Sequence, residues 1–442
     1  MAFLKKIIVG ILAFESRLIL AKYKPFIIAV TGSVGKTSTK DAIYHVLTSP
    51  GVCHDGTGIC FVRRSEKSMN SEIGLPLTVI GAPNAWHSIA GWFQNIVAGL
   101  KLIVKRSEYP DCLILEVGAD HPGDIKRVVK WLKPDIAVIT RVSATPVHVE
   151  FFKSPQEVFE EKAALAHAVK KGGTLVLFAD EEKVSSLASL EKEKGIQVIT
   201  FGMNEKADIK GLQYSVLYDD ANPVGISFDL QMDGTNTPIT VKGIVGQVYL
   251  YPLLAAAAVG KARGVDSNDI VQGLKRYEAP RGRMNLIPGV NGSAIIDDTY
   301  NSSPDAAVSA LATLKGLQFS AGRKVAILGD MMELGKYSAE EHRKVGHEAA
   351  SSAAMLVTVG PRSRATAEEA LKQGMAADAV HAFDTAEEAA AYVKPQVRAG
   401  DIILVKGSQS MRMERVARAL LREPEKAEKL LVRQEREWLG KK

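Results

Sequence analysis

The sequence predicts an α/β protein whose parallel sheets carry helices on both faces. Apolar runs of strand length alternate with longer segments in which apolar residues recur at helical spacing, most regularly between residues 112 and 201. With 442 residues the chain is longer than one hydrophobic core usually serves, so we expect two or three domains. An apolar content of 46% and a charged content of 24% are typical of water-soluble globular proteins.

The first predicted strand, residues 25–30, runs into a glycine-rich turn, Thr-Gly-Ser-Val-Gly-Lys-Thr-Ser, and then into a helix. Gly32 and Gly35 allow a tight turn whose N–H groups point at an anion, and the helix adds the positive end of its dipole. Lys36 is placed to reach terminal phosphates, and the Thr37 hydroxyl is placed to ligate Mg²⁺. The alternative is a turn that binds nothing. We expect a site for ATP and Mg²⁺ formed by Gly32, Ser33, Gly35, Lys36, Thr37 and Ser38.

Further strands are predicted in this region at residues 112–117, 135–140, 174–178 and 197–201, with a helical pattern over 154–169. From 211 to 245 short alternating strands with Asp-Gly and Asn-Pro turns predict a β appendage, and an alanine-rich helix follows at 253–262. These features predict a central P-loop-type parallel-sheet ATPase domain over residues 25–282.

A second α/β unit begins after residues 279–283, Ala-Pro-Arg-Gly-Arg, which we interpret as a hinge. Its predicted strands are residues 293–297, 324–328, 355–359 and 401–405. The tail from residue 423 is charged, and we expect it to be helical. We therefore predict a C-terminal Rossmann-like α/β domain over residues 283–442.

Residues 1–24 predict an amphipathic N-terminal helix, because apolar residues recur at helical spacing from Leu4 to Leu18. The uncharged run from residue 7 to residue 14 is too short to span a bilayer, and no small-residue cleavage site marks a signal peptide. Residues 86–104 form a similar apolar stretch, followed by Lys105 and Arg106. For both segments two interpretations stay open, packing on the domain or lying on a membrane surface.

The formal net charge of +6 is small for this length and the basic residues are scattered, so we expect no nucleic-acid partner. Cys53, Cys60 and Cys112 have neither metal-ligand nor disulfide spacing, which fits a reducing compartment. We expect a monomeric cytoplasmic protein, with peripheral contact to the inner face of the membrane as the open alternative.

Polar segments follow several predicted strands, where α/β sheets place their ligands. Glu116 closes the strand Leu-Ile-Leu-Glu and is suited to hold Mg²⁺ on a nucleotide. Residues 298–304 read Asp-Thr-Tyr-Asn-Ser-Ser-Pro, residues 329–335 read Gly-Asp-Met-Met-Glu-Leu-Gly, and residues 406–410 read Lys-Gly-Ser-Gln-Ser. Each segment alone is as consistent with a polar loop as with a functional one.

In this order and at these intervals the motifs resemble those of the Mur ligases of peptidoglycan synthesis, most closely the MurF type. The resemblance runs from Lys24 to the end of the chain. It is carried by residues 70–76 (Asn-Ser-Glu-Ile-Gly-Leu-Pro), 116–122 (Glu-Val-Gly-Ala-Asp-His-Pro), 297–301 (Asp-Asp-Thr-Tyr-Asn), 329–335 and 406–408.

The resemblance implies ATP-dependent amide bond formation, in which D-alanyl-D-alanine is joined to a UDP-N-acetylmuramoyl tripeptide through an acyl phosphate. It implies catalytic roles for Lys36, His148 and Lys162, with Lys162 carbamylated so that a cation becomes an anion suited to Mg²⁺. The implied Mg²⁺ residues are Thr37, Glu116, His148 and Lys162. The residues implied to close on the nucleotide from the C-terminal domain are Arg283, Asp298, Tyr300 and Asn301. The implied substrate contacts are Asn70, Lys406 and Ser408.

Two departures from the family keep alternatives open. MurF proteins usually carry an N-terminal domain before the phosphate loop, whereas residues 1–24 precede it here. Residues 246–252 read Gly-Gln-Val-Tyr-Leu-Tyr-Pro, where the family often has the His and Asn residues that contact adenine. The alternatives are the same chemistry on a lipid-linked muropeptide or another amino-acid acceptor, as in folylpolyglutamate synthases, and a non-catalytic nucleotide-binding relative.

Overall fold

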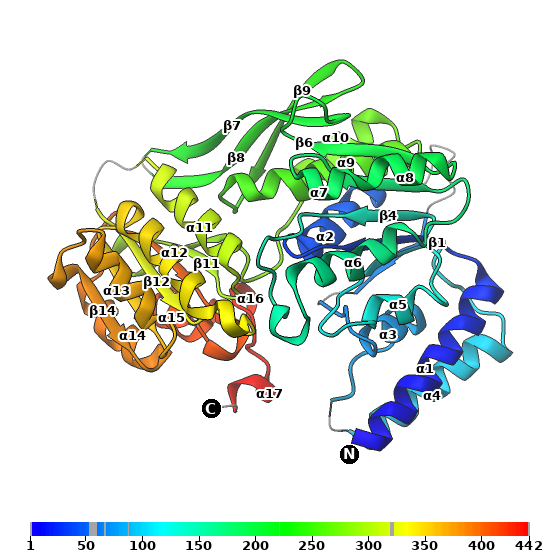
Figure 1. Ribbon diagram of the computed structural model, residues 1–442, viewed down its shortest axis with the longest axis horizontal. Coiled ribbons are helices and arrows are strands. Elements are labelled where there is room, and N and C mark those ends of the chain that lie inside the picture. Colours follow the sequence, from blue (N-terminus) through cyan, green and yellow to red (C-terminus); the bar gives the residue numbers. More distant parts are fainter. Residues whose placement is uncertain are drawn as a thin grey trace.

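The computed structural model describes residues 2–52, 60–65, 68–86, 88–220, 222–318 and 322–440, and it contains two sheets (Figure 1). The strands are β1 (Phe26–Thr31), β2 (Val62–Arg64), β3 (Cys112–Glu116), β4 (Ile136–Ile139), β5 (Thr174–Phe178), β6 (Gln197–Gly202), β7 (Ile209–Asp219), β8 (Asn222–Met232), β9 (Thr235–Lys242), β10 (Asn285–Pro288), β11 (Ala294–Asp298), β12 (Lys324–Gly329), β13 (Met355–Val359), β14 (Val380–Phe383) and β15 (Ile402–Lys406). The α-helices are α1 (Ala2–Tyr23), α2 (Lys36–Leu47), α3 (Gly74–Ile80), α4 (Ile89–Val104), α5 (Asp124–Val128), α6 (Pro155–Ala166), α7 (Glu182–Ser185), α8 (Leu187–Glu193), α9 (Leu250–Ala262), α10 (Ser267–Lys275), α11 (Pro304–Gly316), α12 (Ser338–Ser352), α13 (Arg364–Lys372), α14 (Ala386–Val393), α15 (Glu414–Leu420), α16 (Ala427–Leu430) and α17 (Arg436–Leu439).

The first sheet has nine strands in the order β2-β3-β1-β4-β5-β6-β7-β8-β9. The strands from β2 to β7 pair in parallel, and β7, β8 and β9 form an antiparallel meander at one end. Strands β3, β4 and β5 are buried along their whole length, which explains their continuous apolar runs. Helices α2, α9 and α10 pack together on one face, and α5, α6 and α8 cover the other (Figure 1).

The second sheet has six strands in the order β10-β11-β15-β12-β13-β14, all parallel except β10. Its strands send alternate residues into two cores. Ile296 and Leu404 join the core of the nine-stranded sheet, whereas Ile295 and Ile403 join a separate core on the opposite face. The shared core fixes the two sheets against each other, and the loops that follow β11 and β12 therefore lie beside those that follow β1 and β4.

The predicted α/β class is confirmed, and the predicted strands are present in both sheets. The short strands β2, β10 and β14 were not predicted. The expectation of a helical tail is wrong, because residues 423–440 form only short helical turns. Leu431 is fully buried on extended backbone and Arg433 has a φ of +58°, so a continuous helix would displace a buried side chain. Cys60 is disulfide-bonded, which corrects the expectation drawn from the cysteine spacing.

Helices α1 and α4 lie side by side on the flank of the nine-stranded sheet (Figure 1). The Lys22 ammonium donates to the carbonyl oxygens of Leu102 (2.8 Å), Ile103 (2.9 Å) and Lys105 (3.0 Å), at the end of α4. Both predicted helical segments are thus present and packed on each other. Within the described residues, no helix is long and apolar enough to cross a membrane.

Glu15 carries a buried carboxyl group between these two helices. It is 2% exposed, and neither of its oxygens has a hydrogen-bond partner in the structure. A Cβ on Gly99 of α4 would lie 2.2 Å from its Oε2. Burial raises the pKa of Glu15 to about 7, so ionisation of this group destabilises the fold progressively as the pH rises from 4.5 to about 7.

We therefore predict that Glu15→Met raises the free energy of unfolding by roughly 1–3 kcal/mol at pH 8 and by less at pH 4. Urea denaturation at both pH values measures the difference. The control is Glu108→Met, at an exposed glutamate, which should change neither value. The same pH dependence in Glu15→Met and the wild type would contradict the assignment.

Candidate active site

The phosphate loop follows β1 and ends at the first residue of α2. A Cβ on Gly32, whose φ is +146°, would meet the Thr140 hydroxyl at 1.9 Å, and Gly35 begins α2 with a φ of +87°. Both positions therefore require glycine. The N–H group of Ser33 donates to the carbonyl of Arg141 at 2.7 Å, which holds the loop against the segment after β4.

Glu116, at the end of β3, carries a buried carboxylate that accepts hydrogen bonds from three polar side chains. It is 1% exposed. Its Oε2 accepts a hydrogen bond from the Thr37 hydroxyl (3.0 Å), and its Oε1 accepts from the Ser68 hydroxyl (2.8 Å) and the Asn70 amide (3.1 Å). A carboxylate buried this deeply needs such donors. The sequence pointed to Thr37 and Asn70 but not to Ser68, which nothing local distinguishes from an ordinary loop serine.

Lys36 and Lys162 both donate to the carbonyl oxygen of Gly32, at 2.9 Å and 3.1 Å. Burial, and then the neighbouring Lys36 cation, lower the pKa of Lys162 to about 7. Burial also lowers the pKa of Lys36, an effect that the negative charge of Glu116 opposes. At neutral pH a substantial fraction of Lys162 is therefore the neutral amine, which is the form that reacts with carbon dioxide.

His148 lies between acidic residues from the two sheets. Its Nδ1 is 2.5 Å from the Glu333 carboxylate, which follows β12, and its Nε2 is 3.4 Å from Asp120, which follows β3. The hydrogen bond with His148 is the main cause that lowers the pKa of Glu333. Asp120 acts electrostatically on both Lys36 and Lys162, so His148 belongs to the same charged cluster as the phosphate loop.

Arg283 connects the hinge to the phosphate loop. Its Nη2 donates to the Thr37 hydroxyl at 3.0 Å, and its guanidinium lies 4.2 Å from the centre of the Tyr300 ring. Arg433 lies 5.4 Å from the centre of the same ring. Two cations thus contact the aromatic ring that the sequence assigned to the nucleotide site.

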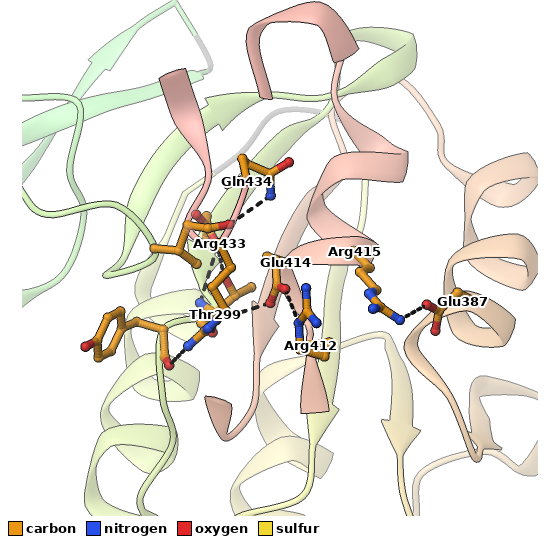
Figure 2. A network of polar contacts seen from close by, with 10 residues as sticks. Thr299, Glu387, Arg412, Glu414, Arg415, Arg433 and Gln434 are labelled. Atoms are coloured by element: carbon orange, nitrogen blue, oxygen red, sulfur yellow. Dashed lines mark hydrogen bonds and ion pairs between the residues drawn. The ribbon is translucent and has the colours of Figure 1, made fainter. Parts of the chain in front are cut away.

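Figure 2 shows how the C-terminal tail holds the segment that carries Tyr300. Arg433 donates to the backbone carbonyls of Thr299 (3.0 Å) and Tyr300 and to the Glu414 carboxylate (3.1 Å). The other oxygen of Glu414 accepts from Arg412 at 2.6 Å. Arg433 and Glu414 are both buried, and neither belongs to a local sequence pattern that marks it as functional.

Two further C-terminal site residues, Lys406 and Ser408, hold loops in place. Lys406 is 2% exposed and donates to the Asp298 carboxylate at 2.7 Å and to the carbonyl of Asn301 at 3.0 Å. The Ser408 hydroxyl accepts from the N–H group of Met332 at 2.9 Å. Lys406 and Ser408, which the sequence assigned to the substrate, therefore fix the loops that carry Asp298 and the neighbour of Glu333.

An aromatic and amide surface replaces the His and Asn residues that the family often has before its alanine-rich helix. Tyr251 packs edge-on against Phe178, with ring centroids 4.8 Å apart, and the Gln247 amide lies 2.9 Å from the Met203 sulfur. Pro252 would be 3.9 Å from a Cβ on Gly35. The surface thus begins beside the phosphate loop.

The residues predicted to hold Mg²⁺ fall into two neighbouring groups. Thr37 and Glu116 are in direct contact, and His148 lies near Lys162 through Asp120. Among the residues that the structure describes, no three His, Cys, Asp or Glu side chains form a ready metal site. The partly neutral amine of Lys162 fits a carbamate, which would supply the additional oxygen ligand that a hard cation needs.

Comparison with known proteins extends over most of the chain. Residues 30–90 and 94–260 match the Mur ligase middle domain, and residues 282–409 match the Mur ligase glutamate ligase domain. The UDP-N-acetylmuramoyl-tripeptide--D-alanyl-D-alanine ligase of Bacillus subtilis is 28% identical, over 90% of this chain and 76% of its own length. The enzyme of that name from Mycobacterium tuberculosis (strain CDC 1551 / Oshkosh) is 30% identical, over 89% and 72%. The structure of the MurF ligase from Thermotoga maritima in complex with ADP superposes with a TM-score of 0.73 at 25% identity, covering 95% of this chain and 84% of that one.

The network around Arg433 should matter more for stability than a similar pair at the surface. Because Arg433→Met leaves Glu414 and two backbone carbonyls short of a buried donor, we predict a loss of about 3 kcal/mol. Arg415→Met breaks the ion pair with the exposed Glu387, which Figure 2 also shows, and should cost under about 1 kcal/mol.

Urea denaturation monitored by tryptophan fluorescence compares the two arginine variants. Equal losses of stability would show that the buried network does not hold the tail.

Proposed function

Because the chain belongs to the Mur ligase family, we propose that it is an ATP-dependent amide ligase of peptidoglycan precursor synthesis. Its reaction joins D-alanyl-D-alanine to a UDP-N-acetylmuramoyl tripeptide. The observation that carries the proposal is the meeting of Thr37, Asn70 and Arg283 at the buried Glu116, because these residues come from both predicted domains and from four of the quoted motifs. The two relatives of this name, 28% and 30% identical, support the choice of substrate class.

In this reaction the γ-phosphoryl group of ATP moves to the carboxylate of the muramoyl peptide, which gives an acyl phosphate and ADP. The amine of D-alanyl-D-alanine then attacks the acyl carbon, and inorganic phosphate leaves. Lys36 offsets negative charge on the phosphoryl group during transfer, and Arg283 brings a second cation from the hinge. Tyr300 and Arg433 keep Arg283 in position.

We propose that Mg²⁺ is held by Thr37, Glu116, His148 and a carbamylated Lys162. When bound, the ion neutralises phosphate charge and polarises the transferred group. The chain's own part is to hold the Glu116 carboxylate in place through its three donors and to keep Lys162 partly neutral through burial. We also propose domain limits at residues 25–282 and 283–442, and a monomeric cytoplasmic enzyme that acts on small molecules.

The rival assignments differ from this one in substrate or in chemistry. A ligase for a lipid-linked muropeptide or for another amino acid would share the phosphate loop and differ in the acceptor. A non-catalytic relative would have no need of Lys162, whose burial beside a second lysine is costly unless it serves the reaction. The Gly-Asp-Met-Met-Glu-Leu-Gly segment, which supplies Glu333, favours the MurF-type acceptor.

The decisive experiment measures phosphate release from ATP with UDP-muramoyl tripeptide, with and without D-alanyl-D-alanine. We expect release that depends on both substrates, together with a pentapeptide product identified by mass spectrometry. Phosphate release with a lipid-linked muropeptide or with glutamate instead would identify that compound as the substrate. No release with any of these compounds would show that the protein binds nucleotide without acting as a ligase.

Lys36 should be essential for the chemistry. We predict that Lys36→Ala lowers turnover by at least about a hundredfold, because it removes the cation nearest to the phosphoryl group. Lys171→Ala, at an exposed lysine outside the site, is the matched control and should retain full turnover. Near wild-type activity in a folded Lys36→Ala protein would refute the role of the loop.

Lys162 should act as a carbamate. We predict that Lys162→Ala is nearly inactive and is partly rescued by short carboxylates, whereas Lys162→Arg, which keeps the positive charge, stays inactive. Because the pKa of Lys162 is about 7, bicarbonate-dependent activity should fall as the pH drops below about 7. An NMR signal from ¹³C-labelled bicarbonate, present in the wild type and absent from Lys162→Ala, tests the adduct without an activity assay. Full activity of Lys162→Arg would contradict the idea.

A further inference from the structure

The pair formed by α1 and α4 is a parallel one. Glu15 of α1 faces Gly99 of α4, and seven residues later Lys22 reaches the carbonyl oxygens of residues 102–105. The two helices therefore run in the same direction, although about 80 residues of sequence separate them. Figure 1 shows the pair at the side of the nine-stranded sheet, away from the six-stranded one.

The covered face of α1 holds Leu12 and Ile19 together with two polar residues, and its exposed face carries a row of large apolar side chains. Glu15 and Ser16 are buried, the latter with its hydroxyl bound to the carbonyl of Leu12 at 2.8 Å. Phe14, by contrast, is 59% exposed. The exposed large apolar side chains of α1 recur at intervals of three and four residues and form one stripe, Ile7, Ile11, Phe14 and Leu18.

Helix α4 also exposes large apolar side chains on one face, while Trp92, Ile96 and Leu102 pack against the core. Its two buried residues are Asn95, whose amide donates to the carbonyl of Pro83 at 2.9 Å, and Gly99. Phe93 is 67% exposed and Val104 is 83% exposed. The exposed large apolar side chains of this helix are Ile89, Phe93, Leu100 and Val104, again on one stripe.

Both stripes point to the same side of the pair. With 100° of rotation per residue, and viewed from the N-terminal ends, the α1 stripe lies roughly 70° anticlockwise from Glu15, and the α4 stripe lies roughly 100° clockwise from Gly99. Because Glu15 and Gly99 face each other in parallel helices, these opposite rotations turn the stripes to one common face. Eight of the thirteen exposed large apolar side chains of the described residues lie on these two helices. Such a concentration is not the scattered exposure of an ordinary surface.

The charges around this face have one sign. Glu15 is the only acidic residue of α1, it is buried, and residues 81–107 contain none. The basic residues of the same two segments whose side chains the structure describes are Arg17, Lys22, Lys101, Lys105 and Arg106. A surface for a second copy of this chain would have to bring these like charges together, whereas an anionic bilayer complements them.

We propose that the common face of α1 and α4 is a docking surface for an anionic lipid bilayer, on which the two helices lie in the plane of the interface. The exposed stripes enter the boundary between headgroups and acyl chains, and the exposed Arg17, Lys101, Lys105 and Arg106 contact the lipid phosphates. The surface holds the enzyme at the membrane and takes no part in the ligase reaction, so it stands apart from the proposed function.

Cosedimentation of the full-length protein with vesicles tests the proposal. With vesicles of phosphatidylglycerol and phosphatidylcholine we expect binding that is lost in pure phosphatidylcholine and weakened at about 0.5 M salt. Phe14→Glu combined with Phe93→Glu should lower the partition coefficient at least about tenfold, because it places charge in the inserted stripe. Leu371→Glu, at a leucine of α13 that is 42% exposed, is the matched control and should bind as the wild type does.

Three results would overturn the docking surface. The first is a wild-type protein that stays in the supernatant at low salt. The second is equal vesicle binding by the double variant and the wild type. A dimer in sedimentation equilibrium that Phe93→Glu dissolves, without vesicle binding, would instead make this face a contact between copies. Ligase turnover of the double variant in solution should equal that of the wild type, so failure here is distinguishable from failure of the proposed function.

Discussion

The buried carboxylate of Glu116 is the point on which the arrangement of this site depends. Taking an ionised carboxylate out of water costs several kcal/mol unless donors replace the water, and Thr37, Ser68 and Asn70 do so from two separate segments. The Thr37 hydroxyl also accepts a hydrogen bond from Arg283, so the hinge residue is connected to Glu116 through Thr37. One charge thereby sets the position of the phosphate loop, of the Asn70 segment and of the second sheet.

The two lysines beside the phosphate loop are the reverse case, because they are positive groups with few acceptors. Lys36 and Lys162 share the Gly32 carbonyl, and Lys36 also donates to the Ser33 carbonyl at 3.3 Å, which leaves the buried Lys162 ammonium with the poorer compensation. Burial lowers the pKa of Lys162, the more deeply buried of the two, to about 7. The negative charge of Glu116 opposes the same effect at Lys36. Their different surroundings thus make Lys36, at the start of α2, a cation for phosphate and Lys162, in α6, an amine open to chemical modification.

How much the sequence predicted depends on whether a feature is local. The phosphate loop, the fully buried strands β3 to β5 and Glu116 at a strand end all have signals within a few residues, and each lies where it was expected. Arg433 has no such signal, because its partners Glu414, Thr299 and Tyr300 are distant in sequence. The helical pattern of the tail failed for the same reason, since burial of Leu431 and the contacts of Arg433 override local preference.

The helices α1 and α4 show a different limit of sequence reasoning. Apolar spacing alone cannot say which side of a helix is covered, so packing and membrane contact predicted the same pattern. In the structure each helix has both kinds of face, because Leu12 and Ile19 are buried whereas Phe14 and Phe93 are exposed. Packing therefore accounts for the covered faces of the two helices, and it leaves the exposed apolar stripes without a partner among the described residues.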